Sequence, residues 1–353
     1  MNFSFQFLVT TLFFVCFGFS LLINYILLRF AQNLGSRNKN DHQIRWNPNI
    51  KPSLGGISFY LVFLLSFIFT VLFPGKAIGF NIQIIGILIA STLAFLMGLA
   101  DDAFNTQPLF KFLTQLFCAL IIIFSGHAIR IFENQFLDYI FTILWVVGLM
   151  NSINMLDNMD GITTIVSICA CVFMVAVNIS LFNTGSYSTI LNLGVLGALC
   201  GFLVYNFHPS RMFMGDTGSQ FLGLFLAVMG IDNCWNNPTS QLLNGFPIAN
   251  PLIVALVFLL PLTDTFTVVI NRMRIGQSPF VGGKDHTTHH LFFRGITEKR
   301  IAILFFLLGI TAVVLAYLLV VRFSFVLFFI SLAFVLTVVL SLYLNTIVKK
   351  RKR

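Results

Sequence analysis

Charge and long polar segments are scarce in this sequence, and their scarcity excludes a soluble protein. Only 9% of the 353 residues are charged, against roughly 25% in an average soluble domain. Hydrophobic residues make up 58%, and the chain holds 43 phenylalanines. No polar stretch is long enough to form a soluble domain of its own. The composition therefore indicates a single integral membrane domain over residues 1–353.

The cysteines and the first apolar run also lack familiar signals. The six cysteines lie mostly inside apolar runs and show neither C-x-x-C metal spacing nor a disulfide framework, so we expect them to be small apolar fillers. No basic segment precedes the first apolar run and no small-residue cleavage site follows it. We therefore interpret this run as the first membrane span, not as a signal peptide.

Apolar runs long enough to cross a bilayer recur along the whole chain, and they predict an all-α polytopic bundle. Within lipid every backbone polar group must be bonded internally, and continuous runs without period-2 alternation favour helices over a barrel. We expect about eleven spans, with ten as the alternative because the fifth and eighth are short. They lie near 5–30, 55–73, 81–99, 108–125, 135–150, 162–182, 188–205, 219–231, 250–270, 301–321 and 323–346.

The basic residues predict the orientation. If the N-terminus is outside, all of the 21 lysines and arginines except Lys76, Arg130 and Arg322 fall on the cytoplasmic side, where they are typically enriched. The net charge of +9 is then mainly a topology signal, and nothing else supports nucleic-acid binding. The expected cytoplasmic segments are loops near 31–54, 100–111, 151–161, 206–218 and 271–299, and a basic C-terminal tail at 347–353 that can attract anionic lipids.

Six aspartates, half of the 12 acidic residues, fall in the cytoplasmic segments near 100–111, 151–161, 206–218 and 271–299, which indicates a site at the membrane boundary. Asp101 and Asp102 stand side by side in GLADDAFNT, directly after an apolar run. Adjacent carboxylates need a cation, and Mg²⁺ typically binds one or two carboxylates together with substrate phosphates. Lys111 is placed to meet a phosphate. For the aspartate pair taken alone, a helix cap is the alternative.

The second polar segment is NSINMLDNMDG at 151–161. If it is helical, Asn151, Asn154, Asp157 and Asp160 recur at multiples of three and share one face. This stripe contains two amides and two acids but no lysine or arginine. The pattern therefore favours a functional face over a merely solvated helix end.

The third polar segment is NFHPSRMFMGDTGSQF at 206–221. Gly215 and Ser219 flank Asp216, and glycine lets the backbone approach a ligand closely. The N-terminus of the following span offers free N–H groups to a phosphate. An ordinary turn, with Asp216 or Ser219 as the N-cap, is the alternative.

The fourth polar segment is GGKDHTTHHLFFRG at 282–295, with Lys284, His286, His289 and His290 close together. We rank contact with a phosphate or pyrophosphate above zinc binding, because no cysteine lies nearby and the carboxylates elsewhere suit a hard cation. A solvated loop is the competing interpretation.

Two weaker candidates complete the set. Lys51 precedes two glycines in KPSLGG, where a nucleotide can approach the backbone, although a simple loop-to-helix junction explains it equally well. Asp264 lies near the middle of the ninth expected span, where an acid suggests function or a bond to a neighbouring helix.

Together, the acids imply a divalent cation and the glycines, lysines and histidines imply anions. The expected chemistry is metal-assisted phosphoryl transfer between a soluble nucleotide-linked compound and a lipid phosphate.

The sequence resembles the polyprenyl-phosphate N-acetylhexosamine-1-phosphate transferases, which form glycosyltransferase family 4. The resemblance lies in the order and spacing of four motifs: GLADD, NSINMLDNMDG, FMGDTGS and HTTHH. The resemblance runs from about Lys51 to Arg300. It implies a bundle of ten or eleven transmembrane helices in the bacterial inner membrane and a requirement for Mg²⁺, with Mn²⁺ as a substitute. It also implies that a UDP-linked amino sugar, such as UDP-N-acetylglucosamine, and undecaprenyl phosphate react to give undecaprenyl-pyrophosphoryl sugar and UMP. A homodimer is left open.

On this basis we assign roles as expectations. Catalysis is expected from Asp101, Asp102, Asp157 and Asp160, and metal binding from Asp216 with Asp102 or Asp157. One of the first pair is expected to take the proton from the lipid phosphate, with direct displacement preferred and a covalent phospho-aspartate left open. Substrate contacts are expected from Lys51, Lys111, Asn151, Asn154, Gly215, Ser219, Lys284, His286, His289 and His290.

The fourth segment also bears on the branch of the family. The phospho-N-acetylmuramoyl-pentapeptide branch typically shows HHHFE, which this chain lacks, so it looks closer to the branch with HxHH that starts O-antigen, enterobacterial common antigen and teichoic acid linkage synthesis. Thr287 stands where that motif begins with histidine, so it is open which histidine contacts the pyrophosphate. A smaller departure is Asn158 in the second polar segment, where the family often has glycine. A transporter is a further alternative, but only Asp264 lies mid-span and we find no internal repeat.

Overall fold

The structure is a computed structural model that describes residues 3–33, 51–72, 81–181, 186–237, 249–278 and 283–347. Regular structure in these ranges is helical, apart from one isolated parallel bridge between Ser53 and Phe213. The all-α class predicted from the sequence is therefore confirmed. Most of the first cytoplasmic loop and nearly all of the basic tail lie outside the described residues, and the predicted orientation of the termini stays a prediction.

Long apolar helices make up most of the chain. Eight of those in the described ranges are long and apolar enough to cross a membrane, or nine if one bent pair is a single span. The protein is thus a multi-pass membrane protein. The helices are α1 (Phe3–Asn33), α2 (Gly55–Leu72), α3 (Ile82–Phe104), α4 (Pro108–Phe124), α5 (Gln135–Leu156), α6 (Ile162–Leu181), α7 (Tyr187–Asn206), α8 (Gly215–Gly230), the π-helix η1 (Ile231–Trp235), α10 (Ala249–Val257), α11 (Leu259–Arg274), α12 (Thr287–Phe293), α13 (Glu298–Val321) and α14 (Phe325–Ile347).

The helices correspond to the expected spans with two informative differences. Helix α5 continues to Leu156, so it carries the start of the second polar segment. The ninth expected span is two helices, α10 and α11, which meet at Phe258 with a bend of 82°. Helices α4 and α8, of 17 and 16 residues, are shorter than the other spans, so the number eleven stays a prediction.

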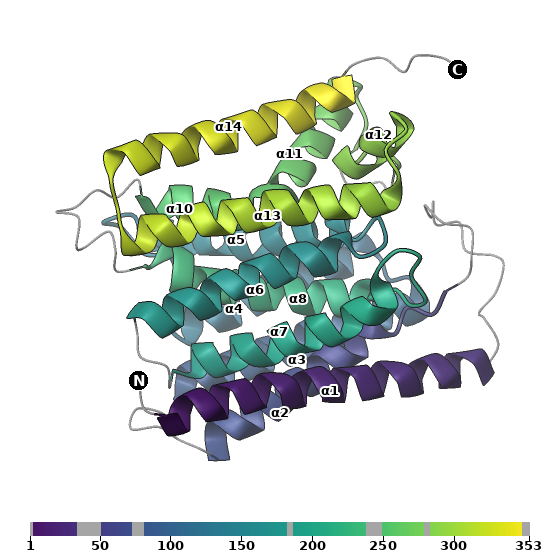
Figure 1. Cartoon of the computed structure of the whole chain (residues 1–353), viewed down its shortest axis with the longest axis vertical. Helices are drawn as coiled ribbons and strands as arrows, with labels where there is room; N and C mark the ends of the chain where they lie inside the picture. The colour runs from purple at the N-terminus through teal and green to yellow at the C-terminus, as the bar shows by residue number, and fades with distance from the viewer. Residues whose placement is uncertain are drawn as a thin grey trace.

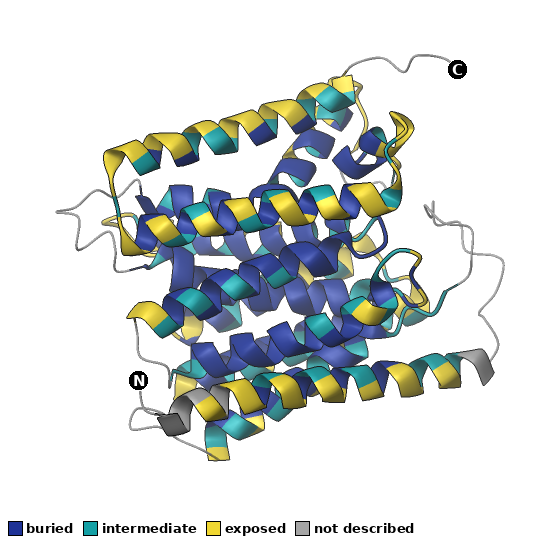
Figure 2. Cartoon of the chain, in the orientation of Figure 1, coloured by how far each residue is buried: buried dark blue, intermediate teal, exposed yellow. Residues whose placement is uncertain are grey.

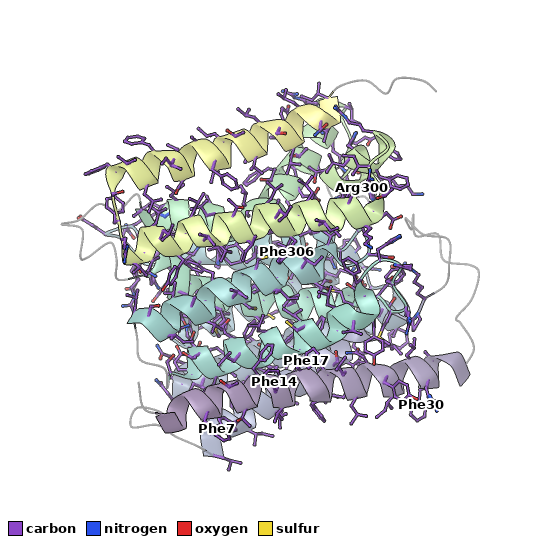
Figure 3. The ribbon with its side chains drawn as sticks, in the orientation of Figure 1. Phe7, Phe14, Phe17, Phe30, Arg300 and Phe306 are labelled. Atoms are coloured by element: carbon purple, nitrogen blue, oxygen red, sulfur yellow. The ribbon has the colours of Figure 1, made fainter. Side chains whose placement is uncertain are left out.

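The helices lie side by side, and the start of α1 and the end of α14 lie at opposite ends of the bundle (Figure 1). Helix α7 packs against α1, α2 and α6, and α8 packs against α3, α5 and α2. Helices α6, α7 and α8 are mostly buried, whereas α1 and α14 are strongly exposed along their outer sides (Figure 2). Phe7, Phe14 and Phe30 project from α1 away from the bundle (Figure 3), as expected of a surface that meets lipid.

Two glycines bring the start of α8 close to α2 and α3. A Cβ at Gly56 would lie 2.1 Å from the backbone N of Gly218, and a Cβ at Gly98 would lie 2.3 Å from the backbone O of Asp216. Small residues allow such backbone contacts between membrane helices. The close packing places the N-terminus of α8 directly beside the end of α3, where Asp101 and Asp102 lie.

Candidate active site

A lysine joins two of the predicted aspartates. The Nζ of Lys111, in the first turn of α4, donates to Oδ2 of Asp216 at 2.9 Å and also pairs with Oδ2 of Asp101. Oδ1 of Asp101 accepts from the backbone N and the hydroxyl of Thr106, at 2.8 and 2.6 Å. The end of α3, the start of α4 and the start of α8 therefore meet at one ammonium group, although Asp216 is 105 positions from Lys111 in the sequence.

Asp102 holds the beginning of α8. Its Oδ1 accepts from the backbone N of Asp216 at 3.0 Å, and its Oδ2 accepts from the backbone N and hydroxyl of Thr217 at 2.8 and 2.6 Å. A carboxylate at a helix N-terminus satisfies free N–H groups and matches the helix dipole. Gly215 makes the approach possible, because it has φ +72° and a Cβ there would lie 2.6 Å from Asp102 Oδ2.

The amides of α5 reach the same place. Nδ2 of Asn154 donates to Oδ1 of Asp216 at 3.0 Å and to the hydroxyl of Ser219 at 2.9 Å. One turn earlier, Nδ2 of Asn151 donates to Oε1 of Gln115 at 2.8 Å, on α4. The prediction that Asn151 and Asn154 share one helix face is confirmed.

The predicted stripe does not continue as a helix, because α5 ends at Leu156. Asp157 follows as the C-cap, and its carboxylate accepts no hydrogen bond from any residue that the structure describes. Burial, together with the negative charges of Asp216, Asp102 and Asp160, raises the pKa of Asp157 to about 8. Asp157 is therefore a carboxyl group crowded by other carboxylates and without a basic partner among the described residues.

Asp160 faces a different set of partners, so the expected single helical face of four polar residues was wrong. It accepts from the backbone N and hydroxyl of Ser210 at 2.9 and 2.7 Å and lies 3.4 Å from Nζ of Lys51. Burial would raise the pKa of Asp160, but these hydrogen bonds and Lys51 hold it below its usual value. Nδ1 of His208 lies 3.3 Å from Asp160 and 3.1 Å from Glu298.

Three residues of this cluster were not predicted from the sequence: His208, Ser210 and Glu298. His208 and Ser210 lie in the quoted segment NFHPSRMF, where polar residues just before a predicted ligand turn were a usable signal. Glu298 gave no such signal, because an acid in the first turn of a helix is common without a ligand.

The histidine segment forms the short helix α12 and the turn before it. Burial and the neighbouring His286 lower the pKa of His289 to about 4, so His289 is a neutral imidazole at physiological pH. Lys284 is exposed, and His290 stacks edge-on against Phe293. The hydroxyl of Thr288 donates to Oδ1 of Asn158 at 2.6 Å, which connects this segment to the acidic loop after α5.

Asp264 belongs with this segment and not with a path through the membrane. It lies on α11, beyond the bend at Phe258, and the side chain of His286 and the backbone N of Thr287 bind its carboxylate, each at 2.8 Å. The prediction of a mid-span acid within one continuous ninth span was wrong. The alternative, a bond to a neighbouring element, is confirmed.

The donor groups at the site fit a hard divalent cation. Asp157 and Asp216 offer carboxylate oxygens, and burial together with the neighbouring carboxylates raises the pKa of Asp157, an effect that a bound cation would oppose. In the part of the chain that the structure describes, Asp160, His208 and Glu298 form a group of potential metal ligands whose ligand atoms lie within 4.8 Å of one another. Lys51 and Ser210 already neutralise and bond Asp160, so that group needs no ion.

Comparison with known proteins supports the resemblance inferred from the motifs. The family model described as glycosyl transferase family 4 matches residues 84–233, which include the aspartate pair, the second polar segment and the turn at Asp216. Over this central region the chain therefore resembles glycosyl transferase family 4. It is similar to the probable undecaprenyl-phosphate N-acetylglucosaminyl 1-phosphate transferase of Bacillus subtilis, at 28% identity over 84% of this chain and 81% of that protein.

Other members of the family are similar as well. The decaprenyl-phosphate N-acetylglucosaminephosphotransferase of Mycobacterium leprae is 28% identical over 74% of this chain and 71% of its own length. The phospho-N-acetylmuramoyl-pentapeptide-transferase of Leuconostoc mesenteroides is 34% identical, but over only 54% of this chain and 64% of its own length. The resemblance expected from the four motifs is therefore confirmed at the level of the family.

Proposed function

We propose that this chain transfers an N-acetylhexosamine-1-phosphate group from a UDP-sugar to undecaprenyl phosphate. The products are undecaprenyl-pyrophosphoryl sugar and UMP, and the reaction begins a cell-envelope polysaccharide at the cytoplasmic face of the membrane. UDP-N-acetylglucosamine is the first candidate donor, because the relatives in Bacillus and Mycobacterium that cover most of the chain are named for N-acetylglucosamine.

One observation carries the proposal. Asp101, Asp102 and Asp216 converge with Lys111 at the N-terminus of α8, and Asp157 adds a further carboxyl group nearby. A helix N-terminus and an ammonium group are suited to phosphate, and clustered carboxylates are suited to a divalent cation. A transporter or a scaffold does not require this combination.

The geometry distinguishes the two adjacent aspartates. Asp101 is buried and binds Thr106 and Lys111, so it positions the lysine. Asp102 is exposed, and its Oδ1 accepts one hydrogen bond, from the backbone N of Asp216, which leaves room for a proton from the lipid phosphate. We therefore assign proton acceptance to Asp102 and orientation of Lys111 to Asp101.

The bond changes follow from this arrangement. An oxygen of the lipid phosphate forms a bond to the phosphorus that carries the sugar, and the bond from that phosphorus to the bridging oxygen breaks, so that UMP leaves. Lys111 holds the phosphate oxygens. Asp157 and Asp216 would hold Mg²⁺, which neutralises charge on the phosphates when it is bound.

The apolar side chains around Lys111 suit a lipid substrate. Phe110, Leu113 and Phe117 on α4 are exposed on the same short helix that carries the lysine. A polyprenyl chain lying on this surface would bring its phosphate to the end of the helix, beside Lys111.

The second candidate is transfer of phospho-N-acetylmuramoyl-pentapeptide. The relative from Leuconostoc mesenteroides supports it, because its identity over the shared region is higher. The sequence HTTHHLFFRG speaks against it, since the HFE continuation typical of that branch is absent. A choice of donors in one assay separates the two.

The test is release of UMP by the purified full-length protein in lipid nanodiscs with undecaprenyl phosphate and Mg²⁺. We expect release from UDP-N-acetylglucosamine and little from UDP-N-acetylmuramoyl-pentapeptide. Asp102→Asn and Asp216→Asn should each reduce release at least about 100-fold, because each removes a charge from the reacting centre. Release from neither donor, or full activity of both variants, would contradict the proposal.

A further inference from the structure

Asp264 binds the histidine segment from a separate helix. Its carboxylate is 1% exposed and accepts three hydrogen bonds, which come from Nδ1 of His286 at 2.8 Å and from the backbone N and hydroxyl of Thr287 at 2.8 and 2.7 Å. All three donors belong to the two residues that begin α12. A buried carboxylate costs free energy unless its oxygens accept hydrogen bonds, so these three bonds stabilise the position of the Asp264 side chain.

The same face of α11 holds the segment at a second point. Arg272 lies eight positions after Asp264, on the same side of the helix. Its guanidinium donates two hydrogen bonds of 2.7 Å to the carboxylate of Asp285. The turn that contains Asp285, His286 and Thr287 is thus clamped between an acid and a base of one helix. The clamp fixes where His286 lies relative to the acidic loop, to which Thr288 is bonded through Asn158.

We infer that Asp264 is a positioning residue, which orients His286 so that its Nε2 faces the anionic substrate. Because a carboxylate only accepts hydrogen bonds, Nδ1 of His286 carries the hydrogen in this pair, and Nε2 is the nitrogen that remains for a ligand. In the imidazolium form Nε2–H donates to a phosphate oxygen. The role of His286 in pyrophosphate contact rests on the proposed function, whereas its bond to Asp264 does not.

The substitution Asp264→Asn separates the orientation of the His286 ring from the anchoring of α12 through Thr287. Both bonds from Thr287 go to Oδ1, so an asparagine oxygen can keep them. The asparagine amide would instead donate to Nδ1 of His286, which leaves a neutral ring with its hydrogen on Nε2 and without the positive charge that strengthens a hydrogen bond to a phosphate. Thr287→Val is the matched control, since it removes one anchoring bond and leaves the Asp264–His286 pair intact.

The experiment combines nitrogen NMR with kinetics on the full-length protein in nanodiscs. Protein labelled with ¹⁵N-histidine should show a protonated Nδ1 for His286 in the wild type and an unprotonated Nδ1 in Asp264→Asn, with the signal assigned by its loss in His286→Asn. UMP release should fall about 10- to 100-fold in Asp264→Asn, the usual effect of losing such a partner, and less than threefold in Thr287→Val. Asp264→Asn should cause no further loss when His286 is already asparagine, because it acts through that histidine.

Each outcome decides the inference. An unprotonated Nδ1 in the wild type overturns it, even if Asp264→Asn proves too unstable to assay. Full activity of Asp264→Asn with the ring hydrogen moved, or an additional loss in the double variant, also overturns it. If the wild type releases no UMP, the proposed function fails, but the NMR measurement still decides whether Asp264 orients His286.

Discussion

The Nζ of Lys111 lies 2.9 Å from a carboxylate oxygen of Asp216, although the two residues belong to different helices and are 105 positions apart. Asp101 binds the same ammonium group. The lysine therefore does two things: it balances the charge of two acids, and it presents a positive charge where a phosphate would bind.

Replacing Lys111 with methionine should reduce UMP release at least about 100-fold, because the substrate loses its cationic contact. It should also lower the melting temperature in metal-free buffer, since two carboxylates are left without a partner. The matched control is Lys299→Met, an exposed lysine near the start of α13, which should change neither. Normal UMP release by Lys111→Met would remove the lysine from the site.

Asp157 predicts how Mg²⁺ binding depends on pH. Its folded pKa of about 8 is above the unfolded value of roughly 4, so ionisation of this group costs stability as the pH rises between the two. A cation bound to the carboxylate offsets that cost. The rise in melting temperature caused by Mg²⁺ should therefore be larger at pH 8 than at pH 6, and Asp157→Asn should remove the difference. An equal rise at both pH values in the wild type would contradict the assignment.

Lys51 and Asp160 predict a stability effect distinct from catalysis. Their side chains are only 12% and 4% exposed, and removing one partner of a buried pair typically costs about 3 kcal/mol. Lys51→Met should destabilise the protein by about that amount at pH 7, and adding Asp160→Asn should recover part of the loss. Because the pKa of Asp160 is lowered in the fold, its contribution is present above pH 4 and is lost as the pH falls further. Chemical unfolding in detergent as a function of pH measures both effects.

Gly98 tests whether the close packing of α3 and α8 is needed. An alanine Cβ there would meet the backbone of Asp216 at 2.3 Å, so the start of α8 must move away from Asp102. Gly98→Ala should lower both UMP release and the melting temperature. Gly148→Ala, in α5, has open space around the new Cβ and should leave both unchanged. If the two variants behave alike, the packing argument is wrong.

Local patterns in the sequence were sufficient to predict the helices and the main gathering of acids. Hydropathy marks each span, and the four polar segments interrupt it at one side of the membrane, so Asp101, Asp102 and Asp216 were expected to meet. Asn154 was placed correctly because it lies on a regular helix, where a spacing of three fixes the face.

The rest depends on contacts between distant segments, which no local pattern encodes. The periodic stripe failed at Asp160 because α5 ends at Leu156 and the chain turns toward Ser210 and Lys51. Asp264 was misplaced because one unbroken apolar run hid the bend between α10 and α11. Pro261, in the first turn of α11, was the available sign that a helix begins there.

The central claim is that the sugar is transferred together with its phosphate. The most direct measurement uses UDP-N-acetylglucosamine labelled with ³²P on the phosphate next to the sugar, purified protein in nanodiscs, undecaprenyl phosphate and Mg²⁺. The account predicts that the label appears in the lipid product and that unlabelled UMP is released in equal amount. Label that stays with the nucleotide as UDP, while the sugar alone passes to the lipid, would contradict it.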